Sequence, residues 1–281
     1  MVFSRHLFAR SKIYIYAKTR PKIYYHYSPK RLYFKPTTTN HIMKKAIPLI
    51  FFLILLSACV EKAGESTQPE MKPGNSLKDI ILQTADNWNI YANFTKSSDD
   101  CVLLVHMLGS DSTSWSVLAD DLNKNRFSTL AIDLRGHGKS TGNVLLNDFT
   151  EEDFHNMILD VAAGVDYLKS ENCKKINIIG ASIGSNLALM RADNDINTVV
   201  LLSPGMDYHG VSIRQSMTLY ANPVMIFASR MDSYSYQSSM MINQAFRSYH
   251  EFIPLEGSAH GTDMLPNPAV RNKIVEWVKK Y

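Results

Sequence analysis

The sequence predicts an α/β protein in which a mainly parallel sheet carries helices on both faces. From residue 101 to the end of the chain, segments with a strand-like pattern alternate with segments of helical periodicity. Residues 101–106 form a continuous apolar run, which is typical of a strand that is buried on both faces. Alternating strands and helices favour parallel pairing, and the sequence shows neither an internal repeat nor a second domain.

The chain begins this pattern with two segments that mix apolar and polar residues. Residues 77–84 and 89–95 flank the turn Ala85-Asp86-Asn87, so we expect an antiparallel hairpin. Further strands are expected at residues 101–106, 127–132, 175–179, 198–202, 223–228 and 249–253. Helices are expected at residues 115–123, 154–168, 186–191 and 236–246, and from Pro268 onward. Apolar residues recur at three- and four-residue steps in the second of these helices.

Basic residues are concentrated at the N-terminal end of the chain. Of the 30 Lys and Arg residues, 11 lie in residues 1–59, which contain no Asp or Glu. The rest of the chain carries 19 basic and 26 acidic side chains and is therefore mildly acidic. No nucleic-acid partner is expected, because binding to phosphates needs a basic surface.

Residues 43–59 contain the three parts of a secretory signal. Two Lys follow Met43, an apolar run covers residues 46–56, and small residues precede Cys59. The run is short for a bilayer span, although an uncleaved membrane anchor is the alternative. Leu56-Ser57-Ala58-Cys59 resembles a bacterial lipobox, which implies that Cys59 is lipidated and becomes the new N-terminus. We expect a lipid-anchored protein of the bacterial cell envelope, on the periplasmic or outer-membrane side and not in the cytoplasm.

The segments on either side of this signal are not expected to build a core. Residues 1–42 are rich in Tyr, Lys and Arg and show no clear period, so we interpret Met43 as the translation start; a functional basic extension is the alternative. Residues 60–76 are polar, contain two Pro and predict a flexible tether. A single folded domain is then expected over residues 77–281.

The strongest chemical signal is a turn around Ser182. The β-branched run of residues 175–179 leads into Gly180-Ala181-Ser182-Ile183-Gly184, and helix-like residues follow at once. This pattern is typical of a sharp strand-to-helix turn that exposes its Ser at the N-terminal end of a helix. The alternative is a glycine-rich turn with an inert Ser.

Four motifs in chain order resemble those of the α/β-hydrolase superfamily over residues 77–281. Besides the turn at Ser182, His106-Met107-Leu108-Gly109-Ser110 resembles the His-Gly-x-Gly loop of that family, and Asp133-Leu134-Arg135-Gly136-His137-Gly138-Lys139-Ser140 resembles its Asp-x-Arg-Gly-x-Gly-x-Ser segment. Asp232 and His260 follow the strands at 223–228 and 249–253, which gives the family's order of Ser, acid and His. The resemblance implies an α/β-hydrolase fold with an eight-stranded, mainly parallel sheet.

The resemblance also implies a role for each of these residues. Ser182 is the expected nucleophile, His260 the base and Asp232 the residue that orients the imidazole. The backbone N–H groups of Ile183 and Leu108 are the expected oxyanion donors. Alternative acids are Asp207, which follows the strand at 198–202, and Asp263, near His260, in which case Asp232 would be a helix N-cap. A separate alternative is that His260 is a merely exposed side chain.

Several other residues of these motifs carry expectations of their own. His106 and His137 each close a loop at a strand end, where we expect bonds to backbone rather than a catalytic role. Met107 departs from the family, which usually has Gly there, so the shape of the oxyanion loop is open. Cys101 and Cys173 fall at the beginnings of strands that this fold places side by side. They would be bridged in an oxidising compartment, and two buried thiols are the alternative.

No metal or cofactor is expected. The sequence has no His-x-x-x-His pair, no Cys cluster and no Gly-rich phosphate loop after the first strand.

The segment between two of the expected strands predicts a minimal cap. Residues 204–222 contain at most one short amphipathic piece, at 211–219. Such a cap favours an open pocket for a short acyl ester, or for an exposed acyl group on a larger molecule. Four residues of the segment either line this pocket or pack the cap: Met206, Tyr208, Met217 and Tyr220.

These observations predict a lipid-anchored serine esterase without a cofactor. A serine peptidase or a thioesterase of the same fold would use the same catalytic residues. A non-catalytic binding module is the alternative from another class, although binding alone would not need Ser182, Asp232 and His260 together. The sequence carries no signal for the oligomeric state.

Overall fold

The computed structural model describes residues 77–142 and 144–281. The basic segment 1–42, the predicted signal at 43–59 with Cys59, and the predicted tether at 60–76 all lie outside the described residues.

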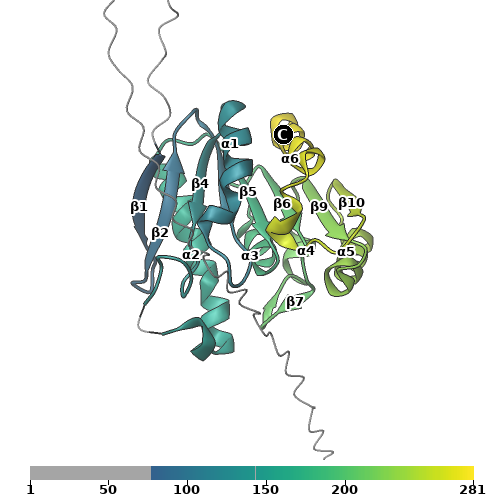
Figure 1. Ribbon diagram of the computed structural model, residues 1–281, viewed down its shortest axis with the longest axis horizontal. Helices are drawn as coiled ribbons and strands as arrows, with labels where there is room; N and C mark the ends of the chain where they lie inside the picture. Colours follow the sequence, from purple (N-terminus) through teal and green to yellow (C-terminus); the bar gives the residue numbers. More distant parts are fainter. Residues whose placement is uncertain (1–76, 143) are drawn as a thin grey trace, which may run out of the picture. The chain divides into compact units, whose positions relative to one another are not determined.

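An eight-stranded sheet organises the described part of the chain, in the order β1-β2-β4-β3-β5-β6-β9-β10 (Figure 1). β2 runs antiparallel to β1 and to β4, and the remaining neighbours are parallel. The mainly parallel sheet and the N-terminal hairpin predicted from the sequence are thereby confirmed. The strands are β1 (Leu77–Gln83), β2 (Asn89–Thr95), β3 (Asp100–Val105), β4 (Ser128–Ile132), β5 (Lys175–Ala181), β6 (Thr198–Leu202), β9 (Val224–Ser229) and β10 (His250–Leu255).

The middle of the sheet forms the core. Every residue of β4, β6 and β9 is buried, whereas most residues of the edge strand β1 are exposed. Apolar and β-branched side chains fill these central strands because helices cover both of their faces. Side chains of β3 alternate between the two hydrophobic clusters, with Leu103 on one face and Leu104 on the other.

Helices pack on both faces of the sheet. α2 (Glu151–Ser170), α3 (Ile183–Arg191) and α5 (Ser233–Ala245) cover one face, which we call the α3 face, and α1 (Ser116–Lys124) and α6 (Pro268–Lys280) cover the other, the α6 face. A capping box formed by Thr150 and Asp153 begins α2, and Asn267 caps α6 ahead of Pro268. Single 3₁₀ turns lie at Ser112–Trp115, Leu146–Asp148 and Gly261–Met264.

The cap differs in detail from the expected single amphipathic piece. Its two-stranded sheet pairs β7 (Asp207–Tyr208) with β8 (Val211–Ser212), and only α4 (Ser216–Leu219) is helical. His209 and Gly210 join the two short strands with φ angles of 52° and 86°, as a two-residue hairpin turn of type I′ requires. Turn chemistry therefore overrides helical periodicity at the beginning of the 211–219 segment.

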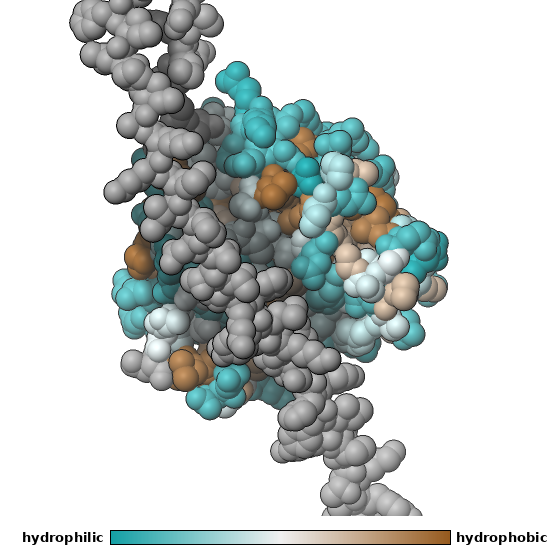
Figure 2. Space-filling model, viewed as in Figure 1, coloured by the Kyte–Doolittle hydropathy of each residue, from teal (hydrophilic) through white to brown (hydrophobic). Residues whose placement is uncertain are grey.

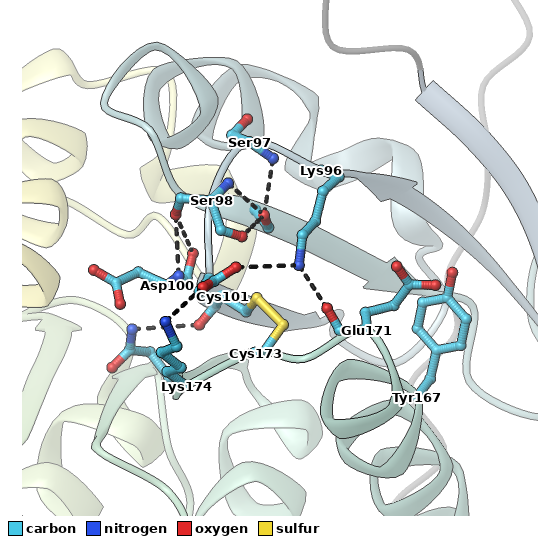
Figure 3. The surroundings of a disulfide bond; sticks show 12 residues. Lys96, Ser97, Ser98, Asp100, Cys101, Tyr167, Glu171, Cys173 and Lys174 are labelled. Carbon is cyan, nitrogen blue, oxygen red and sulfur yellow. Dashed lines mark hydrogen bonds and ion pairs between the residues drawn. A yellow bond between two sulfur atoms is a disulfide. The ribbon is translucent and has the colours of Figure 1, made fainter.

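Cys101 and Cys173 form a disulfide, so the structure decides between the two alternatives that the sequence left open (Figure 3). Cys101 lies in β3, and Cys173 precedes the neighbouring strand β5; their Cα atoms are 5.9 Å apart. Two hydrogen bonds connect the same two segments: Lys174 N donates to Asp99 O at 2.8 Å, and Lys96 Nζ donates to Glu171 O at 2.7 Å.

A buried arginine joins the N-terminal hairpin, the loop after β4 and helix α2. The Arg135 guanidinium lies 2.7 Å from Asp160 Oδ1 and 2.7 Å from Asp86 Oδ2. Arg135 and Asp160 are almost completely buried, so each charge depends on the other for compensation. The Asp-x-Arg-Gly motif therefore holds the loop after β4 in place.

The visible surface of the described residues is mostly hydrophilic, with hydrophobic residues in separate small patches (Figure 2). Isolated exposed hydrophobic residues are normal for soluble folds. Within residues 77–142 and 144–281, none of the helices combines the length and the apolar composition that crossing a bilayer requires.

Candidate active site

Ser182 lies at a sharp turn between β5 and α3. Its backbone φ of 53° and ψ of −120° are strained for a residue with a side chain. The two flanking glycines make the turn possible. A Cβ at Gly180 would overlap the backbone carbonyl of Gly184, and a Cβ at Gly184 would overlap the carbonyl oxygen of Val105. The strand-to-helix turn predicted around Ser182 is therefore present, and its glycines are required by backbone contacts. The exposure predicted for its serine is wrong, because Ser182 is buried at the end of β5.

Asp232 and His260 meet at the same edge of the sheet. They follow β9 and β10, and His260 Nδ1 lies 2.7 Å from Asp232 Oδ2. Asp232 occupies the N-cap position of α5, but its side chain makes no capping bond there. The carboxylate therefore bonds the imidazole and does not cap α5, which contradicts the alternative role of Asp232 as a helix N-cap.

His260 belongs to a loop that packs against the end of β5. A Cβ at the next residue, Gly261, would lie only 3.3 Å from the Cβ of Ala181, the residue before Ser182. The side chain of His260 keeps a relative exposure of 35%, compared with 14% for Asp232. The imidazole is therefore accessible to solvent while its partner carboxylate is shielded.

The other two candidate acids lie elsewhere. Asp207 Oδ1 accepts a hydrogen bond of 2.8 Å from Gly210 N and so stabilises the cap hairpin. Asp207 and Asp263 are both exposed. The structure therefore brings only one of the three acids considered, Asp232, into hydrogen-bond contact with His260.

The environment of Asp232 favours its charged form. Burial raises the pKa of the carboxyl, but hydrogen bonds with His260, Ser235 and Ser203 outweigh this effect, so the pKa lies below its ordinary value. A carboxylate only accepts hydrogen bonds, so Nδ1 of His260 must carry the proton of the pair. The other ring nitrogen, Nε2, is then free to accept a proton, as a general base requires.

Two serines that the sequence reasoning missed hold the His260 loop. Ser203, directly after β6, accepts a bond of 3.0 Å from Gly261 N, and Ser229, the last residue of β9, donates to Ala259 O at 2.6 Å. Both serines are fully buried. The available signal was a small polar residue at the end of a buried strand, but only the fold shows that both contact the loop around His260.

The loop after β3 borders the turn at Ser182, because a Cβ at Gly184 would lie 2.5 Å from His106 O. Ser110 N donates to Met107 O at 3.2 Å, and Gly109 has a φ of 75°, which closes a turn with Leu108 in its middle. Met107 Sδ would lie 2.9 Å from a Cβ at Gly261, so the side chain that replaces the usual Gly packs against the His260 loop. Ile183 begins α3, and its N–H therefore belongs to the unpaired first turn of that helix.

The two histidines expected to bond backbone do so. His106 Nδ1 donates to Met107 O at 2.8 Å, and its Nε2 accepts from Leu134 N at 2.9 Å. Burial lowers the pKa of His106 to about 4, so its ring is neutral near pH 7. His137 Nδ1 bonds Arg135 O at 2.9 Å. Both rings thereby fix the loops that border the candidate site.

In the part of the chain that the structure describes, no group of three or more His, Cys, Asp or Glu side chains is arranged to hold a metal ion. The arrangement around Ser182 instead suits nucleophilic chemistry by a hydroxyl assisted by an imidazole.

A protein-family model described as "Serine aminopeptidase, S33" matches residues 96–260, more than half of the chain. The chain belongs to this family. It is a hydrolase with the α/β-hydrolase fold, and solved structures of other hydrolases share that fold. A comparison with curated protein sequences found no match.

The structural neighbours are distant in sequence. An esterase of Pyrococcus furiosus superposes with a TM-score of 0.64 at 20% identity, covering 74% of this chain and 91% of its own. An esterase of Exiguobacterium antarcticum gives 0.59 at 14% identity, with 72% and 100% covered. A dienelactone hydrolase of Anabaena variabilis gives 0.60 at 16% identity, with 74% and 98% covered. At these identities the likeness shows the fold alone.

Proposed function

We propose that the protein is a serine hydrolase that cleaves carboxylic esters through Ser182, His260 and Asp232. The observation that carries the proposal is the bond of 2.7 Å between His260 Nδ1 and Asp232 Oδ2, in a loop that packs against the strained turn at Ser182. A buried turn serine with no chemical role would need neither the strain nor the paired imidazole.

The proposed reaction has two steps. His260 Nε2 takes the proton of Ser182 while the Ser182 oxygen attacks the ester carbonyl, and Asp232 stabilises the imidazolium that forms. Collapse of the tetrahedral intermediate breaks the bond to the alcohol, which leaves with the proton from His260. Water, activated by the same imidazole, then releases the acid and restores Ser182.

The negative charge of the tetrahedral intermediate needs donors that are already in place. We assign these to the backbone N–H groups of Ile183, at the beginning of α3, and Leu108, in the turn closed by Gly109. The positive end of the α3 dipole favours the same charge. Loss of one such donor typically raises the barrier by about 3 kcal/mol.

The small cap supports an ester with a short acyl chain, or an acyl group exposed on a larger molecule. Between β6 and β9 the chain forms only the two-residue strands β7 and β8 and one turn of helix. Met206, Met217 and Tyr220 pack into the core cluster on the α3 face, so they build the cap rather than an extended channel for a long chain.

The test uses a fluorophosphonate probe, which labels activated serines. The parent protein should be labelled and the Ser182→Ala variant should not, while Ser170→Ala, which changes an exposed serine at the end of α2, should be labelled like the parent. Hydrolysis of p-nitrophenyl acetate should follow the same pattern. A folded parent that neither reacts with the probe nor hydrolyses esters would sink the proposal and favour a non-catalytic binding module.

The family description favours a peptidase as the second candidate. A peptide bond would be cleaved by the same residues, so the discrimination lies in the substrate. Aminoacyl p-nitroanilides and p-nitrophenyl esters of equal acyl size should be compared on the same preparation. A kcat/KM for the anilide that matches or exceeds that for the ester would favour the peptidase.

We also propose that the enzyme is anchored by lipid at Cys59 in the bacterial cell envelope. The lipobox-like sequence before Cys59 motivates this location. The disulfide between Cys101 and Cys173 supports it, because disulfides persist in oxidising compartments.

A further inference from the structure

A groove of about 570 Å³ lies between helix α1 and the strands β1, β2 and β4. Small-molecule sites in proteins commonly have volumes of about 300–1,000 Å³, so the groove is large enough for such a ligand. None of Ser182, Asp232 and His260 lines it, so it is separate from the candidate active site.

The groove lies on the α6 face of the sheet, at the end that carries the N-terminal hairpin. Ala92 and Phe94 of β2 belong to the hydrophobic cluster of the α3 face, so the alternate residues Asn93 and Thr95 point to the α6 face. Leu77 of β1 pairs with Thr95 and keeps a relative exposure of 66%. The described helices therefore leave this part of the face open, and α1, beside β4, forms one wall of the opening (Figure 1).

Three polar residues of the lining are buried. Thr95, Ser112 and Thr129 keep relative exposures of only 6%, 4% and 3%. Ser112 Oγ donates to Asn93 Oδ1 at 3.1 Å, and Thr129 Oγ1 donates to Asn123 Oδ1 at 3.3 Å. The Thr95 hydroxyl, by contrast, makes no hydrogen bond to any described residue. Buried hydroxyls normally have a partner, so this one points to a polar occupant of the groove.

The chemistry of the lining favours a neutral ligand that is rich in hydroxyl groups. Among the described residues of the lining, the one acid and the one base are Asp120 and Lys124, and both are exposed, so no buried charge selects an ion. No aromatic ring is among these residues, so a nucleobase would find no stacking surface. Hydroxyl and amide groups both donate and accept, which suits a ligand whose own groups do the same. Ala119 and Ala131 add apolar surface, which suits the C–H face of a sugar ring.

We infer that this groove is a second binding site, and that its ligand is a neutral saccharide. The sugar hydroxyls bond the hydroxyl and amide side chains of the lining, with the Thr95 hydroxyl as the partner that the protein itself leaves unpaired. The inference does not rest on the proposed function, because it involves neither Ser182 nor a residue that bonds His260.

The test measures binding of three neutral sugars to the full chain by saturation-transfer difference NMR: maltotriose, cellotriose and triacetylchitotriose. The protein is purified in lauryldimethylamine oxide, because a detergent with a sugar headgroup would compete for the groove. At least one of the sugars should bind the parent. Thr95→Val keeps the shape of the side chain and removes its hydroxyl, so it should raise the Kd of that sugar about three- to tenfold, as the loss of one hydrogen bond does.

Two changes on α1 separate the groove from the surface beside it. Ser116 is exposed and lines the groove, so the larger side chain of Ser116→Leu should reduce sugar binding below detection. Val117→Leu is the matched control, because Val117 is 50% exposed and does not line the groove, and this variant should bind like the parent. Urea unfolding should show no loss of stability in Thr95→Val, since its hydroxyl has no protein partner to lose.

Each outcome supports or overturns the inference. A parent that binds none of the three sugars at about 10 mM overturns it, since a site with a Kd near 1 mM would then be nearly full. Binding that Thr95→Val and Ser116→Leu both leave unchanged also overturns it, because the sugar then occupies another surface. A blocked peptide, N-acetyl-trialanine amide, that binds as tightly as the best sugar and responds to the same variants would replace the saccharide by a peptide. A parent that binds sugar and hydrolyses no ester loses the proposed function and keeps this site.

Discussion

The structure selects Asp232 from the three candidate acids that the sequence leaves open. Three acids follow strands or lie close to His260 along the chain, and spacing alone does not choose among them. The structure places the Asp232 carboxylate 2.7 Å from His260 Nδ1 and leaves Asp207 in the cap turn. The side chain of Asp232 makes no capping bond to α5.

We expect Asp232→Asn to lower kcat for ester hydrolysis by about 10⁴-fold, because the amide favours the wrong imidazole tautomer, as it does in serine proteases. Asp207→Asn is the matched control: its amide oxygen still accepts from Gly210 N, and kcat should stay within about twofold of the parent, as is usual for surface changes. Steady-state kinetics with p-nitrophenyl acetate gives both values. Equal losses in the two variants would contradict the assignment of the acid.

Asp160 should make stability depend on pH. Burial raises its pKa from 3.8 to about 6, despite the opposing effect of the Arg135 guanidinium. Between about pH 4 and pH 6 the folded protein therefore binds more protons at this site than the unfolded chain does, so the site's contribution to stability falls as pH rises through this window and is constant above it. A shift of this size corresponds to about 3 kcal/mol.

Comparison with Asp160→Asn isolates this effect, since the amide does not titrate. Urea unfolding at several pH values should show that the difference in unfolding free energy, parent minus variant, becomes smaller by about 2 kcal/mol from pH 4 to pH 7. A difference that stays constant over this range would show that Asp160 titrates with an ordinary pKa in the folded protein.

At the scale of elements, the position of the proposed nucleophile Ser182 depends on contacts between neighbouring strands. The turn after β5 fits only because Gly184 lies against the end of β3 and Gly180 against the beginning of α3. The disulfide connects the beginnings of β3 and β5, at the opposite end of these strands from the turn. Strand pairing, the disulfide and the glycines thus act together on the position of Ser182.

Removal of the disulfide should lower stability by about 4 kcal/mol, because it closes a loop with a sequence separation of 72. The variant with Cys101→Ala and Cys173→Ala should show this loss in urea unfolding under non-reducing conditions. The reductant dithiothreitol should then lower the free energy of unfolding of the parent and leave that of the variant unchanged. A parent that contains two free thiols after unfolding without reductant would contradict the disulfide itself.

At the scale of the whole molecule, the chemistry gathers at the carboxyl edge of the parallel strands. Ser182, Ser203, Asp232 and His260 follow four neighbouring strands, β5, β6, β9 and β10. Loops from that edge of an α/β sheet converge on one crevice, which is why such sheets bind their ligands there. Between β6 and β9, the described residues add two short strands and one turn of helix near this edge.

Attachment of the whole chain to a membrane is a separate prediction. Cys59→Ser should abolish incorporation of labelled fatty acid in bacterial cells and move the protein from the detergent phase to the aqueous phase in a Triton X-114 partition. Ester hydrolysis by Ser182 should be unchanged, because residue 59 precedes the domain. Continued membrane association of an unlabelled variant that retains residues 43–58 would favour the uncleaved anchor.

The sequence by itself determined the order of the strands and helices, and it singled out Ser182, Asp232 and His260. These are local properties: a buried strand needs an apolar run, and a sharp turn into a helix needs glycines on both sides of its serine. Periodicity failed only where turn chemistry competed with it, at residues 211–212 of the cap hairpin.

The tertiary structure alone decided which acid meets His260 and that Cys101 and Cys173 are bonded. It also revealed Ser203 and Ser229 as supports of the His260 loop. Each of these facts joins residues that lie far apart along the chain, such as the 28 positions between Asp232 and His260. Contacts of that kind are set by how strands pair and helices pack, and no local pattern encodes them.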